Sequence, residues 1–405
     1  MGLFGPPNIE KMKNKRDVDG LIKALTYPDN GDVRKNAALA LGTLKDASAV
    51  EPLIFALEKK GWDLPLNLAA AESLGKIRDE RAVIPLISKL FSAYECEVAA
   101  EALAQIGAPA VGPLIAFVME NQRSPMANEA LAALKKVSDP RAFEQLIAAG
   151  SHSNSYVRAA AMLALGGIGD SRAMELLIRG LGDLPAAAAE AIAMVGPRLE
   201  DGALRAHAHE GLIAILKGNQ DWHLRWMAAH ALEQSGWQPV TEEDKAWYWT
   251  LLEKWDQCAT LGEAAVIPCM AALRSNSAST YEGAGKTLAR IGDPAVGPLI
   301  EILQDFTIDT WTRRTVVEAL GQIGPSQAIE LLVSLLQSND FEIRLSVAQA
   351  LVKLYYSGKL NSQFKEMLHA NQEIITKRVH IDKGGGRCDN AWERIDRTYP
   401  GVDFL

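Results

Sequence analysis

Residues 30–54 read NGDVRKNAALALGTLKDASAVEPLI, and two phrases inside this stretch recur along most of the chain. The first phrase, ALGTL at 40–44, returns as SLGKI at 73–77, ALGGI at 164–168 and ALGQI at 319–323. The second phrase, VEPLI at 50–54, returns as VIPLI at 83–87 and as VGPLI at 111–115 and 296–300. The prolines of successive copies, Pro52, Pro85 and Pro113, lie 33 and 28 residues apart. A fixed period near this length indicates stacked structural units.

Each unit is predicted to hold two α-helices. Apolar residues recur at steps of three and four, which places them on one helix face, and the alternation typical of strands is absent. The proline of the second phrase suits the first turn of a helix, where its missing N–H is not needed. We therefore predict an all-α fold, a right-handed α-solenoid of about ten two-helix repeats between residues 17 and 358.

An Asp or Asn followed four positions later by Arg marks the second helix in five units. The pairs are Asn30 and Arg34, Asn154 and Arg158, Asp221 and Arg225, Asp309 and Arg313, and Asp340 and Arg344. The Asp or Asn suits the N-cap, because its side chain accepts a hydrogen bond from a first-turn N–H. The Arg lies one turn further on, within reach of its own cap or the neighbouring unit. We interpret these residues as a structural ladder, with further caps predicted at Asp63, Ser92 and Ser277.

Composition and charge exclude several functions. The chain has 405 residues, 48% of them apolar, and a formal net charge of −8, so no protein-wide positive field attracts nucleic acid or an anionic membrane. Four cysteines without a CxxC pair favour a reduced protein. The uninterrupted apolar stretches are shorter than the ~18 residues of a membrane span. We predict a cytoplasmic protein that binds neither nucleic acid nor a membrane.

The repeat resembles the short HEAT-like repeat first named for phycobilin lyases. The resemblance rests on the repeat length, the proline of the first helix, openings such as NGDVR at 30–34 and the ALGxI endings, and it covers residues 17–358. It implies the solenoid fold. It does not fix the function, because lyases, metal-dependent hydroxylases and scaffolds share this repeat.

The period is disturbed between residues 198 and 262, where six of the nine tryptophans fall. Large aromatic side chains fill an irregular joint in one hypothesis, and they form a binding patch in the other. The predicted organisation is an N-terminal extension at 1–16, a first repeat array at 17–197, a Trp-rich joint at 198–262, a second array at 263–358, and a C-terminal helix and tail at 359–405.

No catalytic motif stands out in the sequence. The patterns GxSxG, GxxxxGK[ST] and HExxH are absent. The di-iron hydroxylases that resemble this chain carry several His-Glu dipeptides, whereas here only His209-Glu210 qualifies. We therefore predict that the protein is not an enzyme and has no catalytic residue, no cofactor and no metal site. The alternative, implied by the resemblance, is a phycobilin-lyase-like or other tetrapyrrole-handling enzyme subunit.

The main prediction is a scaffold that binds another protein along the concave groove of the second helices. The residues predicted to contact this partner are Trp226, Trp247, Trp249, Glu101, Glu129, Arg314 and Glu318. Because four of the exposed groove positions, Glu101, Glu129, Glu190 and Glu318, are acidic, a basic or neutral polypeptide is favoured. The partner's identity and the oligomeric state are left open.

Overall fold

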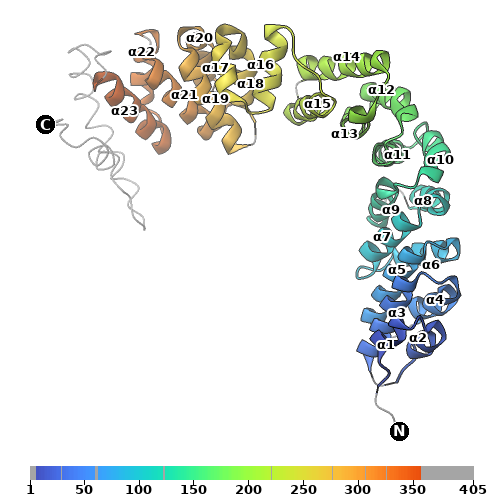
Figure 1. Cartoon of the computed structure of the whole chain (residues 1–405). Helices are drawn as coiled ribbons and strands as arrows, with labels where there is room; N and C mark the ends of the chain where they lie inside the picture. Colours follow the sequence, from blue (N-terminus) through green and yellow to red (C-terminus); the bar gives the residue numbers. More distant parts are fainter. Residues whose placement is uncertain are drawn as a thin grey trace, which may run out of the picture. The chain divides into compact units, whose positions relative to one another are not determined.

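The computed structural model describes residues 6–356, apart from residues 29, 60–62, 122–123, 220, 276, 306 and 325. This described part contains 23 α-helices joined by short 3₁₀ turns and loops, and it contains no strand (Figure 1). The prediction of an all-α solenoid is therefore confirmed. The predicted C-terminal helix and tail at 359–405 lie outside the described residues.

The chain divides into two compact units. Unit 1 takes the residues up to 215 together with 230–237, and unit 2 takes 216–229 together with the residues from 238 onward. Both switches fall inside the segment 198–262, where the sequence period is disturbed. Helices α14 (Gly202–Gly218) and α15 (Trp222–Gln234) each contribute residues to both units.

The helix bounds follow the predicted repeat. Unit 1 holds α1 (Ile9–Asn14), α2 (Val18–Ala24), α3 (Gly31–Leu44), α4 (Val50–Glu58), α5 (Leu64–Ile77), α6 (Val83–Lys89), α7 (Cys96–Ile106), α8 (Ala108–Glu120), α9 (Met126–Lys136), α10 (Phe143–Ala149), α11 (Ser155–Ile168), α12 (Met174–Asp183) and α13 (Pro185–Val195). Unit 2 holds α16 (Glu242–Leu251), α17 (Trp255–Thr260), α18 (Val266–Ala272), α19 (Ala278–Ile291), α20 (Asp293–Gln304), α21 (Thr310–Ile323), α22 (Ser326–Leu335) and α23 (Phe341–Tyr356).

Within each unit the second helices of successive repeats pack side by side. In unit 1 this row runs through α3, α5, α7, α9, α11 and α13, and in unit 2 it runs through α17, α19, α21 and α23. Each first helix packs against the second helix of its own repeat, as α4 does against α5 and α20 against α21. In the segment predicted as an N-terminal extension, α1 packs against α2 and α3.

The glycine of the ALGxI phrase sets how closely two second helices approach. A Cβ placed on Gly166 in α11 would stand 2.8 Å from the Cα of Ala191 in α13. Gly42 and Gly75 face the Cα atoms of Ser73 and Ala102 in the same way, each at 2.7 Å. Real Cβ atoms do not sit this close to a backbone atom, so the phrase requires glycine at this position.

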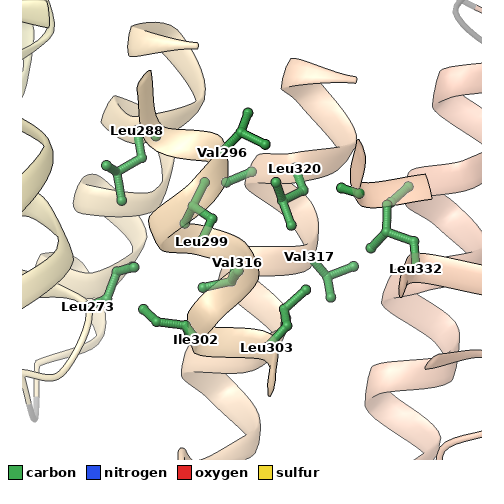
Figure 2. Packing of buried hydrophobic residues seen from close by; sticks show 14 of the residues in the cluster. Leu273, Leu288, Val296, Leu299, Ile302, Leu303, Val316, Val317, Leu320 and Leu332 are labelled. Carbon is green, nitrogen blue, oxygen red and sulfur yellow. The ribbon is translucent and has the colours of Figure 1, made fainter. Parts of the chain in front are cut away.

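The core of unit 2 shows why the apolar pattern dictates this packing. Leu288 of α19, Leu299 of α20 and Leu320 of α21 are fully buried in one continuous cluster. Figure 2 shows their side chains pointing into the space between neighbouring helices. Because each helix buries one stripe against its own repeat and a second against the next, the core of unit 2 extends along the stack as one continuous strip.

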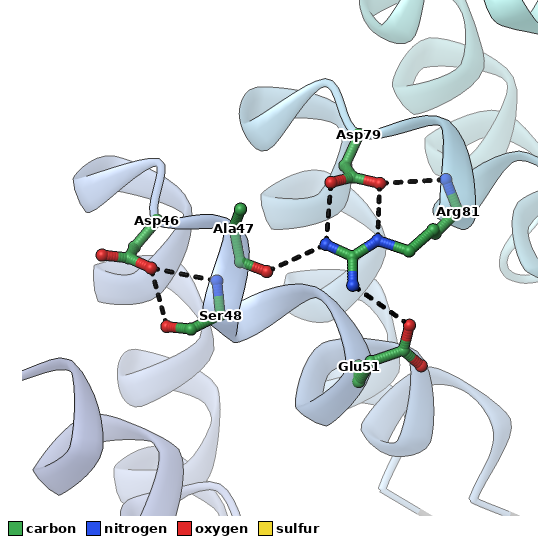
Figure 3. Close-up of polar contacts among 6 residues, drawn as sticks. All are labelled: Asp46, Ala47, Ser48, Glu51, Asp79 and Arg81. Atoms are coloured by element: carbon green, nitrogen blue, oxygen red, sulfur yellow. Dashed lines mark hydrogen bonds and ion pairs between the residues drawn. The ribbon is translucent and has the colours of Figure 1, made fainter.

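Short turns with the pattern Asp-x-Arg join successive repeats, and the sequence analysis did not identify them. In the turn before α6, Asp79 accepts hydrogen bonds from the backbone N–H and the guanidinium of Arg81. Arg81 also donates to Glu51 of the preceding repeat at 3.3 Å and to the carbonyl of Ala47 at 3.1 Å (Figure 3). The turn therefore fastens one repeat to the one before it.

The Asp139–Arg141 turn also connects one repeat to the one before it, and here the hydrogen bonds lower the pKa of the carboxyl strongly. Asp139 accepts from the Arg141 guanidinium at 2.9 Å and from the backbone N–H of Ala108, at the start of α8, at 3.2 Å. The Arg141 guanidinium, together with the Arg141 and Ala108 amides, outweighs the opposing effect of burial and lowers the pKa of Asp139 to about 2. The carboxylate thus caps a helix of the preceding repeat.

Replacing Asp139 by Asn is expected to destabilise unit 1 by about 1–2 kcal/mol at pH 7, because the ion pair is lost. The folded-state pKa lies below the ordinary value of 3.8, so the carboxylate's contribution is complete above about pH 4 and is lost as the pH falls toward 2. Urea unfolding of both proteins at several pH values between 7 and 2 measures this effect. The variant should lose less stability than the parent over that acid range, and equal losses would contradict the assignment. Asp256→Asn, at a highly exposed carboxylate, is the control.

Candidate functional site

The Asp and Asn residues of the ladder accept hydrogen bonds from the first turns of their helices. The donors are backbone N–H groups: Val33 donates to Asn30, Tyr156 and Val157 to Asn154, His223 and Leu224 to Asp221, Thr312 to Asp309, and Glu342 and Ile343 to Asp340. The predicted cap at Asp63 makes no such bond. Its carboxylate accepts instead from Nε of Arg34 at 2.6 Å. Ser277 also forms no side-chain cap bond, and the N-cap of α7 is Glu95 rather than Ser92.

The ladder arginines bind the loop before their own helix. Arg34, Arg158 and Arg344 donate to the carbonyls of Tyr27, His152 and Ser338 at 2.7 to 2.9 Å. Arg225 differs, because it donates to the carbonyl of Lys217 in the last turn of α14, at 3.2 Å. Arg158 also reaches Asp183 of the next repeat at 2.6 Å. These contacts lie within the stack, and a purely structural role for the ladder stays a prediction.

Replacing Asp340 by Ala is expected to lower the free energy of unfolding by about 1 kcal/mol, the usual cost of a lost N-cap. Asp340 accepts from two amides of α23 and from the hydroxyl of Thr310 in the preceding second helix at 2.6 Å. Thermal and urea unfolding measure the loss, and Asp340→Asn, which keeps an acceptor, is the matched control. Unchanged unfolding together with lost ligand binding would show that the ladder binds rather than supports.

The tryptophans of the predicted joint differ in exposure. Trp247 is only 7% exposed, and the guanidinium of Arg225 lies over its ring at 3.9 Å. Trp249 is partly buried against the core of unit 2. The ring of Trp247 packs Arg225 against α16, so little of it is open to a partner, and its contact with a partner stays a prediction. Trp226, in contrast, is 40% exposed.

Trp226 lines a cleft of about 590 Å³ in unit 2, called the Trp226 cleft below. Its lining residues are Asp221, Trp222, His223, Trp226, Leu251, Glu253, Arg274, Ser275, Ser277 and Thr280. They come from the start of α15, the end of α16, the loop after α18 and the start of α19. The volume lies in the range of sites that hold a small organic ligand.

One wall of the Trp226 cleft is a flat aromatic surface. The rings of His223 and Trp226 stack with centroids 5.7 Å apart and planes 12° from parallel. The two residues are three positions apart on α15, so they share one helix face. Such a surface suits a planar conjugated ligand.

The opposite parts of the cleft are polar. Glu253 adopts a left-handed backbone conformation with φ 54°, and its carboxylate accepts a hydrogen bond from Thr280 at 2.5 Å. Arg274 is exposed and supplies a guanidinium, which binds carboxylates well. The arrangement can therefore hold a flat molecule that carries an anionic group. No general acid or nucleophile is assigned in it.

The remaining predicted contact residues lie in two other places. In unit 2, Arg314 and Glu318 form an ion pair at 3.0 Å in a hollow of about 230 Å³ beside the exposed Trp311. In unit 1, Glu101 pairs with Lys136 at 2.7 Å. Glu129 in α9 is half-buried. The structure does not bring these residues into one site with Trp226, and their binding role stays a prediction.

The residues that complete the cleft were missed in the sequence. His223 could have been found from its spacing of three to Trp226 on one helix. Arg274 and Glu253 carry no comparable signal, because they lie in irregular segments whose positions depend on the packing of unit 2. Among the described residues, no three His, Cys, Asp or Glu side chains gather as they would around a metal ion. The described helices also include none with the length and apolar character that crossing a bilayer requires.

Comparison with known proteins gives three curated relatives of the same kind. The chain is 32% identical over 180 residues to "Phycocyanobilin lyase subunit alpha" of Picosynechococcus sp., with 39% of this chain and 66% of the relative aligned. It is 32% and 34% identical over 152 residues to "Bilin biosynthesis protein PecE" of Mastigocladus laminosus and of Nostoc sp.. Those two alignments cover 36% of this chain and 55% and 58% of the relatives, so the chain spans just over half to about two thirds of the curated relatives it matches.

The solved structures resemble this chain more distantly. The complex of CpcE and CpcF of phycocyanin lyase from Nostoc sp. shares 21% identity, covers 66% of this chain and 98% of that chain, and gives a TM-score of 0.29. A structure of importin beta shares 14% identity, covers 95% and 68%, and gives a TM-score of 0.35.

The three curated relatives correct the functional prediction. They are named as a lyase subunit and as bilin biosynthesis proteins, so the predictions of a non-catalytic scaffold and of a protein that is not an enzyme are wrong. Those predictions rested on the absence of a recognised catalytic motif, but a binding groove needs no such motif.

The family follows from the repeats themselves. HEAT repeats match residues 18–104, 111–196 and 268–352, more than half of the chain. These segments coincide with the stacked helix pairs of units 1 and 2. The chain therefore belongs to the HEAT repeat family, and its repeats are of the phycobilin-lyase type.

Proposed function

We propose that this protein is a subunit of a lyase-type enzyme that handles a bilin, an open-chain tetrapyrrole. The observation that carries the proposal is the 32–34% identity to the phycocyanobilin lyase subunit and the two PecE proteins. The aligned parts cover 36–39% of this chain. The activity of the whole protein is therefore a proposal.

The Trp226 cleft is the proposed bilin site. A bilin consists of conjugated pyrrole rings and carries carboxylate side chains. The stacked His223–Trp226 surface supports binding of the rings, and the guanidinium of Arg274 supports binding of a carboxylate. With a net charge of −8, the general field of the protein does not attract an anionic ligand. Binding of such a ligand therefore depends on a localised cation.

In this proposal the protein binds and orients the bilin, and a second polypeptide completes the enzyme. A lyase adds a group to a double bond or removes it, and such a reaction depends on how the reacting atoms are positioned. The cleft's residues fix the ring plane and the carboxylate. The name of the first relative, a subunit, supports a protein partner for this chain.

The first test is a titration of the purified chain with phycocyanobilin, followed by bilin absorbance and quenching of tryptophan fluorescence. Saturable binding with a Kd on the order of 1 μM, accompanied by a change in the bilin spectrum, is expected. An unchanged spectrum with no quenching at tens of micromolar would overturn the proposal.

The second test measures the chemistry. The chain is co-expressed with a lyase partner subunit, apo-phycocyanin and a bilin source, and covalently attached bilin is detected by zinc-induced fluorescence on a denaturing gel. The amount of attached bilin is expected to depend on this chain. An equal amount of attached bilin with and without this chain would contradict a lyase role. Bilin binding is decided separately, by the first test.

A further inference from the structure

Two buried thiols meet in the wall of unit 2 that borders the Trp226 cleft. Cys258 lies in α17 and Cys269 in α18, and neither side chain is exposed to solvent. The hydroxyl of Thr250 in α16 lies 3.5 Å from Sγ of Cys258 and 3.8 Å from Sγ of Cys269. Both sulfur atoms thus lie around the same hydroxyl oxygen. Three helices thus direct their polar side-chain atoms to one point.

The surroundings of this pair are apolar. Ala246, Ala265 and Val266 belong to the same buried cluster. Within the described residues, the hydrogen bonds of the Thr250 hydroxyl go to the two sulfur atoms. The sulfur of a neutral thiol is a weak acceptor and a weak donor, so its hydrogen bond with the hydroxyl is weak. A thiolate accepts a stronger hydrogen bond, so the hydroxyl stabilises the thiolate more than the thiol.

The two thiols differ in acidity. The hydrogen bond from Cys269, aided by Thr250, lowers the pKa of Cys258 against the opposing effect of burial. The contact with Cys258 and burial both raise the pKa of Cys269. Cys258 also lies in the six-residue helix α17, which opens more readily than α18, so we assign it the attacking role, and Cys269 lies where it resolves a mixed disulfide.

The short helix α17 gives a route to the buried sulfurs. Helix α17 has only six residues, and it lies between Glu253 and Gly262, which have φ angles of 54° and 58°. A helix of this length opens locally at low cost. Trp255 at its start lies against Gly283 of α19.

We propose that Cys258 and Cys269 form a reversible disulfide and are a redox modification site beside the Trp226 cleft. The oxidant is a small-molecule disulfide such as oxidised glutathione. The Cys258 thiolate attacks one sulfur of glutathione disulfide, which forms a mixed disulfide and releases one glutathione thiolate. The Cys269 thiolate then attacks Sγ of Cys258 and releases the second. The two protons of the cysteines end on the two glutathione molecules.

The disulfide acts on the cleft through α16 and the turn after it. It links α17 to α18 across ten intervening residues and removes the thiol partners of Thr250. Thr250 precedes Leu251 directly, and both Leu251 and Glu253 line the Trp226 cleft. The oxidation state of the pair therefore sets how firmly this wall is held. This inference does not depend on which ligand the cleft binds.

The experiment uses the full chain with Cys96 and Cys388 replaced by Ser, which leaves the pair alone. The reduced protein is equilibrated at pH 8 with graded ratios of oxidised to reduced glutathione, alkylated, digested and analysed by mass spectrometry. A single Cys258–Cys269 disulfide is expected, with one midpoint ratio, a rise in Tm of several degrees and slower hydrogen exchange in α17. The same peptide mapping of the unsubstituted chain covers the case in which the double variant does not fold.

A resolving-cysteine variant separates a paired site from two unrelated thiols. In Cys269→Ser the glutathione adduct at Cys258 is expected to accumulate, because nothing displaces it. Two outcomes would overturn the proposal. In one, both thiols stay reduced in the folded protein at every ratio, and in the other each carries its own glutathione without forming the disulfide.

Discussion

Trp226→Ala is expected to weaken phycocyanobilin binding about 30-fold, a loss of about 2 kcal/mol of binding free energy. The substitution removes the larger ring of the His223–Trp226 stack, which forms one wall of the cleft. Because Trp226 is 40% exposed, the loss of core packing is small. Fluorescence titration of the remaining tryptophans and bilin absorbance give the two Kd values.

Trp311→Ala is the matched control for this prediction. Trp311 is an exposed tryptophan of the same unit, and it lines the other hollow, beside Arg314. Its replacement should leave the Kd within about twofold of the parent value, whereas Arg274→Ala should weaken binding about tenfold by removing the carboxylate contact. If Trp311→Ala and Trp226→Ala have equal effects, the bilin is not bound in the Trp226 cleft.

Gly166→Ala is expected to destabilise unit 1 by about 1–3 kcal/mol, the range found for overpacked cores. The added Cβ would stand 2.8 Å from the Cα of Ala191 and 3.0 Å from its Cβ. A backbone atom cannot move aside as a flexible side chain does, so helices α11 and α13 must separate. Urea and thermal unfolding followed by circular dichroism measure the change.

The neighbouring glycine gives the opposite expectation. Gly167 lies in the same helix but is exposed, and an added Cβ there meets nothing within 4 Å. Gly167→Ala should therefore stabilise the protein by about 0.5–1 kcal/mol through helix propensity alone. Equal effects of the two substitutions would show that close approach of the second helices is not what the ALGxI glycine provides.

The repeat architecture was predictable because the same pattern of apolar residues recurs many times along the chain. A single copy of VxPLI or ALGxI is weak evidence, but copies at a constant period fix both the helices and their stacking. The Asp-x-Arg turns are repeated too, at 79–81, 139–141 and 170–172, and the spacing of Asp and Arg was available in the sequence. Each of these turns is too short to show the apolar periodicity that reveals the helices, so that pattern does not reveal them.

The Trp226 cleft was predictable only in part. Trp226 was correctly expected to be exposed, but Trp247 was not expected to lie under Arg225, because the broken period leaves no helix face against which to assign it. Glu253 and Arg274 reach the cleft from a strained turn and a loop. Their positions follow from the packing of α16, α18 and α19, which local sequence preferences do not specify.

The inter-repeat contacts also bear on how such a chain changes in length over evolution. Some repeats carry both a glycine that accepts the following helix and a turn that binds the preceding repeat, as the repeat with Gly75 and the one that begins at the Asp79–Arg81 turn show. A tandem duplication of one whole repeat would therefore bring a matching pair of surfaces with it. Loss of one whole repeat would leave the flanking surfaces complementary. A partial insertion would leave one of them exposed, so growth and shrinkage by complete repeats is the route that this interface permits.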